Sequence, residues 1–321
     1  MWVAIAAGVV VVVACALFAI GDDSVQPAGA TPYYPSRIVA VTYDGRLVVA
    51  SARDGHALRV LATDANAAGG LAVSPDGNTV YYARDTGNRC ANGDPITAIA
   101  SIPVTGGDAT ELVTNVRYPA VSPDGRYLAF TGIPNCSDAG RAILVRDLYS
   151  TTHNGSYDGV WGPQSAASPW VDIQSLSWAP DSRHILFTHA SSTSTGEDDA
   201  RPRLLDTRAR FQTYLDTSPV VRVAPNVVCC YLGVKDALVG SALDAHGFAR
   251  DVVVLNTRTG TRVRTLTCCG APIATDRAGR ALLIHFTDTT HPGGIFRWSP
   301  GQRRPTFLGS LLFTAAWLPG G

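Results

Sequence analysis

The sequence of 321 residues predicts an all-β fold, a six-bladed β-propeller preceded by an N-terminal transmembrane helix. Three observations lead to this prediction. Hydrophobic residues make up 46% of the chain and charged residues only 16%, which argues against disorder and against a solvated helical assembly. One turn motif recurs along the chain, with short β-rich segments around each copy. The two ends of the repeated region also carry complementary parts of one repeat.

The first element is an apolar segment. Residues 2–20 carry no charge, and as a helix they would rise about 28 Å, enough to cross the hydrocarbon core of a bilayer. A cleavable signal peptide is the alternative, although no basic residue precedes the segment. The run from Val12 to Cys15 also resembles a lipobox, in which Cys15 would be lipidated. The sequence therefore predicts an anchor or signal-anchor over 1–20, a linker over 21–36 and an extracytoplasmic domain over 37–321, in a bacterial cell envelope.

The repeated turn has the pattern Ser/Ala-Pro-Asp-Gly/Ser. Serine at the first position and proline at the second favour a type I turn, and glycine at the fourth tolerates its exit geometry. An apolar segment precedes each copy and a β-rich segment follows it, as in a hairpin. The aspartates of the three clear copies are therefore predicted to be turn formers rather than metal ligands or catalytic groups: Asp76, Asp124 and Asp181.

Weaker copies continue the series. Residues 228–236 and 273–276 each precede a further apolar segment, at 237–240 and 281–284. A third and a fourth strand follow each hairpin, most clearly within 252–266. Four antiparallel strands in a unit of about 45 residues form the blade of a β-propeller.

The two ends of the repeated region predict how the ring closes. Residues 38–61 supply the second, third and fourth strands of a blade that has no inner strand. Residues 315–320 match the inner-strand segment 176–181, with nothing after them. The C-terminal strand is therefore expected to complete the first blade. This gives six blades, and closure removes the exposed sheet edges.

The apolar segment, the Pro-Asp-Gly turn and the aromatic-aliphatic strand together resemble the TolB-type β-propeller repeat, which is related to WD-repeat and prolyl-oligopeptidase propellers. The resemblance covers about residues 37–321. It implies an extracytoplasmic, non-enzymatic domain that binds proteins or ligands on one face of the ring. The pattern of a peptidase domain, or of the small domain that accompanies the propeller in TolB, is not found.

Motifs for chemistry were not found either. The chain has no Gly-x-Ser-x-Gly elbow, no Walker loop and no dinucleotide fingerprint. His184 and His189 are close in sequence, but their odd spacing on a strand places them on opposite faces, which disfavours a shared metal. The 26 basic residues balance 26 acidic ones, so no field attracts nucleic acid. No cofactor and no nucleic-acid partner are expected.

Two insertions exceed the usual blade length, and loops on a rigid scaffold often carry binding. The first, about 150–171, holds the candidate anchors Tyr157, Trp161 and Trp170, which could instead cover a small cluster of the loop itself. The second, 191–201, ends in the acidic residues Glu197, Asp198 and Asp199. These could steer a cationic partner, bind calcium or form a solvated tip.

Six cysteines follow the anchor, an even number that is expected to pair in an oxidising compartment. Cys90 and Cys136 both follow second strands of neighbouring blades and are predicted to form a disulfide. The doublets Cys229-Cys230 and Cys268-Cys269 are predicted to begin equivalent inner strands and to share one or two bridges. Bonds inside each doublet are the strained alternative.

Loops from the second to the third strand, and from the fourth strand to the next blade, leave a propeller on one face. Both insertions and the cysteines map to this face, which is therefore the predicted docking surface. The leading functional hypothesis is a membrane-anchored module that binds a protein or a cell-envelope component without chemistry. The alternative is a metal-dependent lactonase or hydrolase with its metal in the central channel. A structural spacer in an envelope complex is a third hypothesis that the sequence does not separate from the first.

Overall fold

The computed structural model describes residues 37–91, 93, 95–132, 142–150, 159–161, 171–191, 201–208, 211–214, 228–231, 237–243, 249–256, 262–268, 271–276, 279–285 and 293–319. The chain divides into two compact units, Met1–Tyr34 and Pro35–Gly321, and all described residues belong to the second. The predicted anchor over 1–20 and linker over 21–36 lie outside the described residues. Within the ranges given above, no helix is both long enough and apolar enough to cross a membrane.

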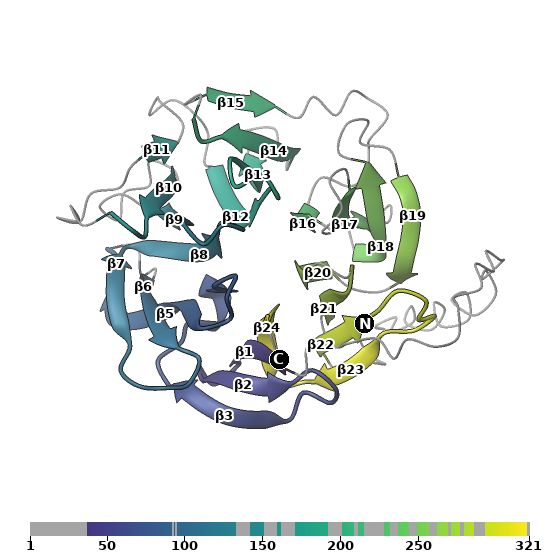
Figure 1. The fold of residues 1–321 in the computed structure, drawn as a ribbon, viewed down its shortest axis with the longest axis horizontal. Coiled ribbons are helices and arrows are strands. Elements are labelled where there is room, and N and C mark those ends of the chain that lie inside the picture. Colours follow the sequence, from purple (N-terminus) through teal and green to yellow (C-terminus); the bar gives the residue numbers. More distant parts are fainter. Residues whose placement is uncertain are drawn as a thin grey trace, which may run out of the picture. The chain divides into compact units, whose positions relative to one another are not determined.

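The described strands form six four-stranded antiparallel sheets, called blades 1 to 6 (Figure 1). In each blade the strands are given from the inner strand outward. Blade 1 consists of β24 (Leu312–Trp317), β1 (Arg37–Thr42), β2 (Leu47–Ser51) and β3 (Ala57–Ala62), and blade 2 of β4 (Leu71–Val73), β5 (Thr79–Arg89), β6 (Pro95–Pro103) and β7 (Thr110–Thr114). Blade 3 consists of β8 (Val116–Val121), β9 (Tyr127–Gly132), β10 (Ala142–Asp147) and β11 (Gly159–Trp161). Blade 4 consists of β12 (Val171–Trp178), β13 (His184–Ser191), β14 (Arg201–Asp206) and β15 (Phe211–Tyr214). Blade 5 consists of β16 (Val228–Tyr231), β17 (Ala237–Leu243), β18 (Ala249–Asn256) and β19 (Arg262–Cys268). Blade 6 consists of β20 (Ala271–Thr275), β21 (Ala281–His285), β22 (Gly294–Trp298) and β23 (Thr306–Gly309). A short 3-10 helix, η2 (Ala67–Gly69), lies just before β4.

The inner strands contact one another in a circle. β24 contacts β4, β4 contacts β8, and the contacts continue through β12, β16 and β20 back to β24 (Figure 1). The predicted all-β propeller is therefore confirmed. In the weak copy predicted at 228–236, the described residues Val228–Tyr231 form β16, the inner strand of blade 5.

The C-terminal strand completes blade 1, as the sequence predicted. β24 pairs with β1, with Ala315 opposite Ala40 and Trp317 opposite Ile38. The apolar run of β1 is buried after its first residue, because a strand between two neighbours and two flanking blades has no face left for water. Fully burying one large apolar side chain stabilises a fold by about 1.5–3 kcal/mol, so these contacts are a strong reason for the ring to close.

Blades pack through apolar faces. Between blades 2 and 3, for example, Ile99 of β6 belongs to one cluster with Leu128 and Phe130 of β9, and all three side chains are fully buried. Similar clusters join blades 3 and 4, blades 5 and 6, and blades 6 and 1. The core of the unit is therefore a series of interfaces between neighbouring sheets.

The Pro-Asp-Gly segments form the predicted turns. The backbone nitrogen of Gly77 donates to the carbonyl of Ser74 at 2.8 Å, and Gly125 donates in the same way to Ser122 at 2.8 Å. The carboxylate of Asp76 accepts from the Ser74 hydroxyl at 2.5 Å and from the Asn78 backbone nitrogen at 3.0 Å. Asp124 and Asp181 accept corresponding bonds from backbone nitrogens of their own turns. The turn-forming role predicted for the three aspartates is confirmed.

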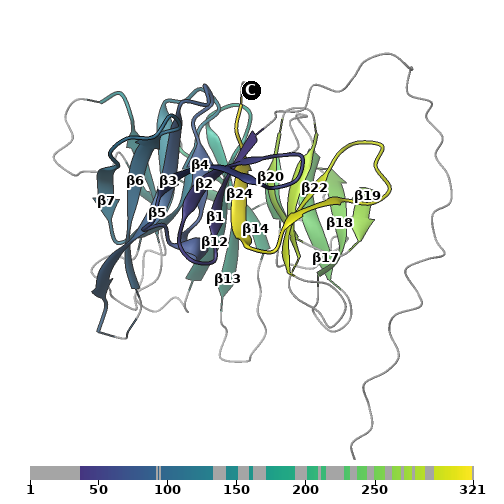
Figure 2. The same ribbon diagram turned by 90° about the horizontal axis from the view of Figure 1, so that it is seen from below.

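The unit has two faces, seen edge-on in Figure 2. The turn face, at the top, carries the described turns from first to second and from third to fourth strands, including Ser74–Asn78 and Ser122–Arg126. The loop face, at the bottom, carries those connections from second to third strands and from one blade to the next that belong to the described residues. It includes the tip of the β5–β6 hairpin, Asn115 between β7 and β8, and Leu311 just before β24.

Two predicted locations need correction. The insertion at about 150–171 was expected to be a loop, but Gly159–Trp161 forms β11, the outer strand of blade 3, with Trp161 opposite Ile143. The segment Gly-Val-Trp suits a strand and supplies the missing fourth position of the blade. Cys268 was expected to begin an inner strand, but it is the last residue of the outer strand β19 and lies opposite Asp251. Cys229 and Cys230 lie on the inner strand β16, as predicted.

Candidate functional site

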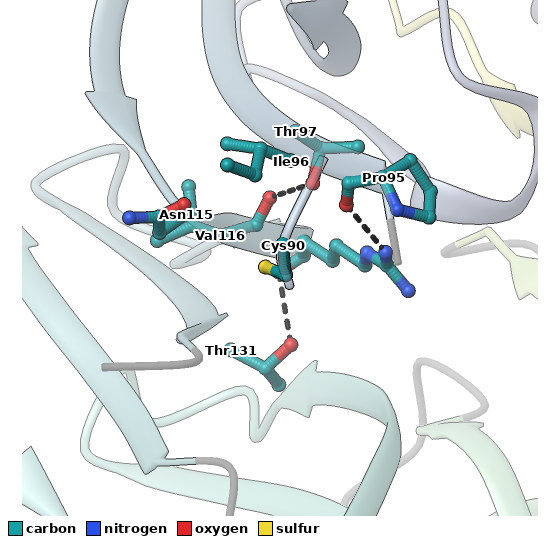
Figure 3. A pocket seen from close by; sticks show the side chains of 8 residues that line it. Cys90, Pro95, Ile96, Thr97, Asn115, Val116 and Thr131 are labelled. Carbon is teal, nitrogen blue, oxygen red and sulfur yellow. Dashed lines mark hydrogen bonds between the residues drawn. The ribbon is translucent and has the colours of Figure 1, made fainter. Parts of the chain in front are cut away.

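A depression on the loop face lies between blades 2 and 3 (Figure 3). It is shallow, and its empty space of about 280 Å³ includes open solvent. The space therefore suits one small group rather than a large ligand. Its lining comes from the β5–β6 tip, β6, β8 and β9: Cys90, Pro95, Ile96, Thr97, Asn115, Val116, Arg117 and Thr131.

One wall of the depression is an extended hairpin. β5 is 11 residues long and stays paired with β6 as far as Arg89 opposite Pro95. The hydroxyl of Thr86 donates to the carbonyl of Ile96 at 2.6 Å, and the Arg89 guanidinium donates to the carbonyl of Gly93 at 3.1 Å. These bonds hold the tip together and place Cys90 at the depression. Cys90 is disulfide-bonded. Its predicted partner, Cys136, lies outside the described residues, so the pairing stays a prediction.

The opposite wall contains a strained backbone segment. Asn115 has φ 61° and Tyr118 has φ 54°, so left-handed residues lie on both sides of Val116-Arg117. A bulge shifts the register of β8 against β9 between Arg117 and Ala120. Left-handed φ is a true outlier for a bulky residue such as tyrosine, and such strain costs about 1–3 kcal/mol per residue. Among the described non-glycine residues, Ser182 is the third with a left-handed φ, and it lies on the turn face.

Buried hydroxyl groups hold this segment in place. Thr97 of β6 donates to the carbonyl of Val116 at 2.6 Å, and Thr131 of β9 donates to the carbonyl of Arg117 at 3.3 Å (Figure 3). Both threonine residues are 2% exposed. Because buried hydroxyls require partners, Thr97 of blade 2 and Thr131 of the segment's own blade 3 fix its conformation.

The depression has a cationic group. The guanidinium of Arg117 donates to the carbonyl of Pro95 at 2.9 Å, which connects the two walls (Figure 3). Among the residues that the structure describes, no carboxylate forms an ion pair with Arg117. Other arginines in the same ranges do have acidic partners within 4 Å: Arg46, Arg84, Arg126, Arg183, Arg262 and Arg280.

An apolar patch lies on the same face in blade 1. Tyr43 is 53% exposed and Leu311 is 67% exposed, and the Tyr43 backbone nitrogen donates to the Leu311 carbonyl at 3.0 Å. The ring of Tyr43 packs edge-on against Phe313 of β24 at 5.1 Å between centroids. The loop face therefore presents both a cationic depression and exposed aromatic and aliphatic side chains.

The turn face is different, because its polar groups satisfy one another. The Ser74 hydroxyl and the Asn78 backbone amide hold the pKa of the Asp76 carboxyl below its usual value. Burial alone would raise the pKa of Asp181, but hydrogen bonds from the Arg183 backbone and from His184 lower it. These carboxylates stay ionised because the turn itself supplies the donors.

The turns also pack against one another across blades. The Asp124 backbone nitrogen donates to the hydroxyl of Ser182 at 3.1 Å. A Cβ built on Gly77 would lie 2.4 Å from the carbonyl oxygen of Pro319. His184 contacts Asp181 at 2.6 Å and Asp206 at 3.7 Å, within this local network. Within the described ranges, no group of three or more His, Cys, Asp and Glu side chains could hold a metal ion.

The sequence-predicted binding residues are placed only in part. Trp161 lies on β11, in the outer strand rather than in a loop. Tyr157, Trp170, Glu197, Asp198 and Asp199 lie outside the described residues, as does Cys269. The anchoring role of these tryptophans and the steering role of the acidic residues therefore stay predictions.

Sequence reasoning missed Asn115, Arg117 and Tyr118. Two signals were available in the segment Asn115-Val116-Arg117-Tyr118-Pro119. Asparagine before a strand tolerates the left-handed conformation, and proline inside an inner strand indicates a bulge. Neither signal points to Arg117, whose importance comes from contacts with another blade.

No protein-family model matches the chain, and no curated protein matches it. Solved structures of propellers are similar. A putative TolB from Agrobacterium tumefaciens is 19% identical, with 73% of this chain and 78% of that chain covered and a TM-score of 0.49. The β-propeller domain of the Trilobed protease from Pyrococcus furiosus is 15% identical, with 72% and 68% covered and a TM-score of 0.44.

The acylaminoacyl peptidase from Pyrococcus horikoshii is 16% identical, with a TM-score of 0.45. The similarity covers 71% of this chain but only 37% of that peptidase. At these identities the similarity concerns the propeller fold alone.

Proposed function

We propose that the propeller is a non-enzymatic binding module that holds a protein or a cell-envelope component on its loop face. The observation that carries the proposal is the strained segment from Asn115 to Tyr118, which lines the depression between blades 2 and 3. Backbone strain persists only where surrounding contacts enforce it, and it concentrates at functional sites. Here Thr97 and Thr131, both buried, are the groups that enforce it.

The apolar patch supports the same face. Tyr43 and Leu311 are among the most exposed large apolar side chains of the described chain, and they lie side by side through a backbone hydrogen bond. Exposed aromatic residues next to polar groups are typical of interfaces. On the turn face, the carboxylates of Asp76 and Asp181 are engaged in local hydrogen bonds.

The proposed location of the module is extracytoplasmic, with 1–20 as its membrane anchor. The charge-free segment at 2–20 supports anchoring. The oxidised state of Cys90 supports an oxidising compartment, because cytosolic cysteines are kept reduced.

Partner capture from envelope extract of the source cells tests the proposal. The full chain carrying both Tyr43→Ala and Leu311→Ala is expected to lose the proteins or envelope components that the wild type retains. The matched control is Tyr149→Ala, which removes a 73% exposed tyrosine that lies beyond β10, on the turn face. Circular dichroism must show that both variants are folded. Equal capture by the loop-face variant and the wild type would contradict the proposal.

A further inference from the structure

We propose that the depression between blades 2 and 3 is a carboxylate-binding site, in which Arg117 pairs with the anionic group of an acidic ligand. This inference rests on the proposed binding function and names the chemistry that the loop face recognises. A peptide C-terminus and a glutamate side chain both supply such a group.

The charge of Arg117 is the first argument. A guanidinium has five N–H donors and stays protonated at any ordinary pH. Arg117 is half-buried, lines the depression and donates to one carbonyl, that of Pro95. No described carboxylate pairs with it. A partly desolvated cation of this kind is stabilised by a bound anion, and carboxylate matches the planar fork of arginine.

Preorganisation is the second argument. The hydrogen bond to the Pro95 carbonyl holds the guanidinium of Arg117 at the depression that both residues line. The bonds from Thr97 and Thr131 fix the carbonyls of Val116 and of Arg117 itself. The backbone that carries the cation is therefore rigid before any ligand arrives, which lowers the entropic cost of binding.

The remaining lining defines the ligand further. Ile96 and Val116 contribute apolar surface beside the cation. Asn115 lines the side opposite Pro95 in Figure 3 and adds an amide, which can donate and accept. The depression is shallow and open to solvent, so only the end of a ligand can enter it. The site thus suits a carboxylate attached to a short apolar stem.

Saturation-transfer NMR with the full chain in detergent tests this site. The probes are acetyl-Ala-Val with a free carboxylate, the same peptide with a C-terminal amide, and N-acetylglutamate α-amide. Saturable binding is expected for at least one carboxylate probe, and which of the two binds identifies the source of the group. If acetyl-Ala-Val with a free carboxylate binds, the same peptide with a C-terminal amide should bind at least tenfold more weakly.

Variants identify the residue. Arg117→Gln should weaken carboxylate binding at least tenfold, and Arg117→Lys should retain part of it. The matched control is Arg59→Gln, because Arg59 is an exposed arginine that also donates to a backbone carbonyl, that of Thr105 at 2.7 Å. This control should bind as the wild type does. A thermal melt shows whether each variant is folded.

Any of three results would overturn the inference. The first is that neither carboxylate probe shows saturable binding, and the second is that a folded Arg117→Gln variant binds a carboxylate probe as tightly as the wild type. The third is that the amidated peptide binds as tightly as the peptide with a free carboxylate. These failures are distinct from failure of the proposed function. If capture from envelope extract needs Tyr43 and Leu311 but a folded Arg117→Gln variant binds the probes like the wild type, only the carboxylate site is wrong.

Discussion

Ile38 and Trp317 are direct antiparallel partners, so the first and last described strands lie side by side in one sheet. Trp317 is 6% exposed and also packs with Ala271 and Leu282 of blade 6. The guanidinium of Arg280 lies 4.8 Å from the centre of its ring. The C-terminal strand therefore joins blade 1 to blade 6.

Deletion of residues 314–321 is expected to unfold or strongly destabilise the protein. The deletion removes Ala315, Trp317 and Leu318, each 6% exposed or less, and leaves β1 with an unpaired edge. Loss of a buried tryptophan side chain alone costs about 3–5 kcal/mol. Urea denaturation measures the effect, with deletion of residues 320–321 as the control. An unchanged unfolding midpoint for the longer deletion would mean that closure by β24 does not stabilise the ring.

Two tryptophans at equivalent inner-strand positions should respond differently to replacement by phenylalanine. The indole nitrogen of Trp178 donates to the carbonyl of Ala120 at 2.9 Å, whereas that of Trp317 is buried and has no acceptor among the described residues. Trp178→Phe removes this buried hydrogen bond, which costs about 0.5–1.5 kcal/mol. Trp317→Phe removes an unpartnered donor and keeps a ring beneath Arg280. Chemical denaturation should therefore show Trp178→Phe to be the more damaging by about 1–2 kcal/mol, and the reverse order would contradict the assignment.

Two turn glycines provide a similar comparison. Gly77 and Gly125 both have φ +75°, so alanine at either position costs about 1–2 kcal/mol. Only at Gly77 would the new Cβ meet a backbone atom, the Pro319 oxygen at 2.4 Å; at Gly125 the nearest atom is Pro75 Cδ at 3.6 Å. Gly77→Ala should therefore be the more destabilising by a further 1–3 kcal/mol or so. Equal thermal stabilities for the two variants would show that the turns of neighbouring blades do not pack as described.

Most of the fold could be predicted because its signals are local and repeated. The Ser-Pro-Asp-Gly turn of Ser74–Gly77 carries its own hydrogen-bond partners, so the sequence determines the turn without help from distant residues. The unmatched segments at 38–61 and 315–320 predicted closure for the same reason. Trp161 was misplaced because an outer strand of three residues is too short to show the alternation of a strand.

The candidate site could not be predicted, because its features come from contacts between blades. The left-handed φ of Tyr118 accompanies a close approach to Gly70, where a Cβ would lie 3.3 Å from the Tyr118 Cα. The hydroxyls that hold Val116 and Arg117 come from β6 and β9. Serine and threonine in β-rich segments are too common to indicate such a role. Arg117 is one of 26 basic residues, and its lack of an acidic partner among the described residues is visible only in the structure.

Peptide mapping without reduction should recover Cys90 in a cross-linked peptide. Cys90 is disulfide-bonded at the end of an 11-residue strand, and the predicted partner is Cys136, in the corresponding loop of the neighbouring blade. Mass spectrometry before and after reduction checks both the bond and the partner. A linked peptide that contains a different cysteine would correct the pairing, and a free thiol at Cys90 would contradict the oxidising location as well.

Site-specific photo-crosslinking in the source cells shows whether the loop face is the binding face. A photoreactive phenylalanine derivative replaces Tyr43 on the loop face or Tyr149 on the turn face, which are 53% and 73% exposed respectively. Both positions are open to solvent, so each side chain can react with a partner that covers it. We expect light-dependent adducts of higher mass from position 43 and none from position 149. Adducts from position 149 alone, or from neither position in folded protein, would contradict this expectation.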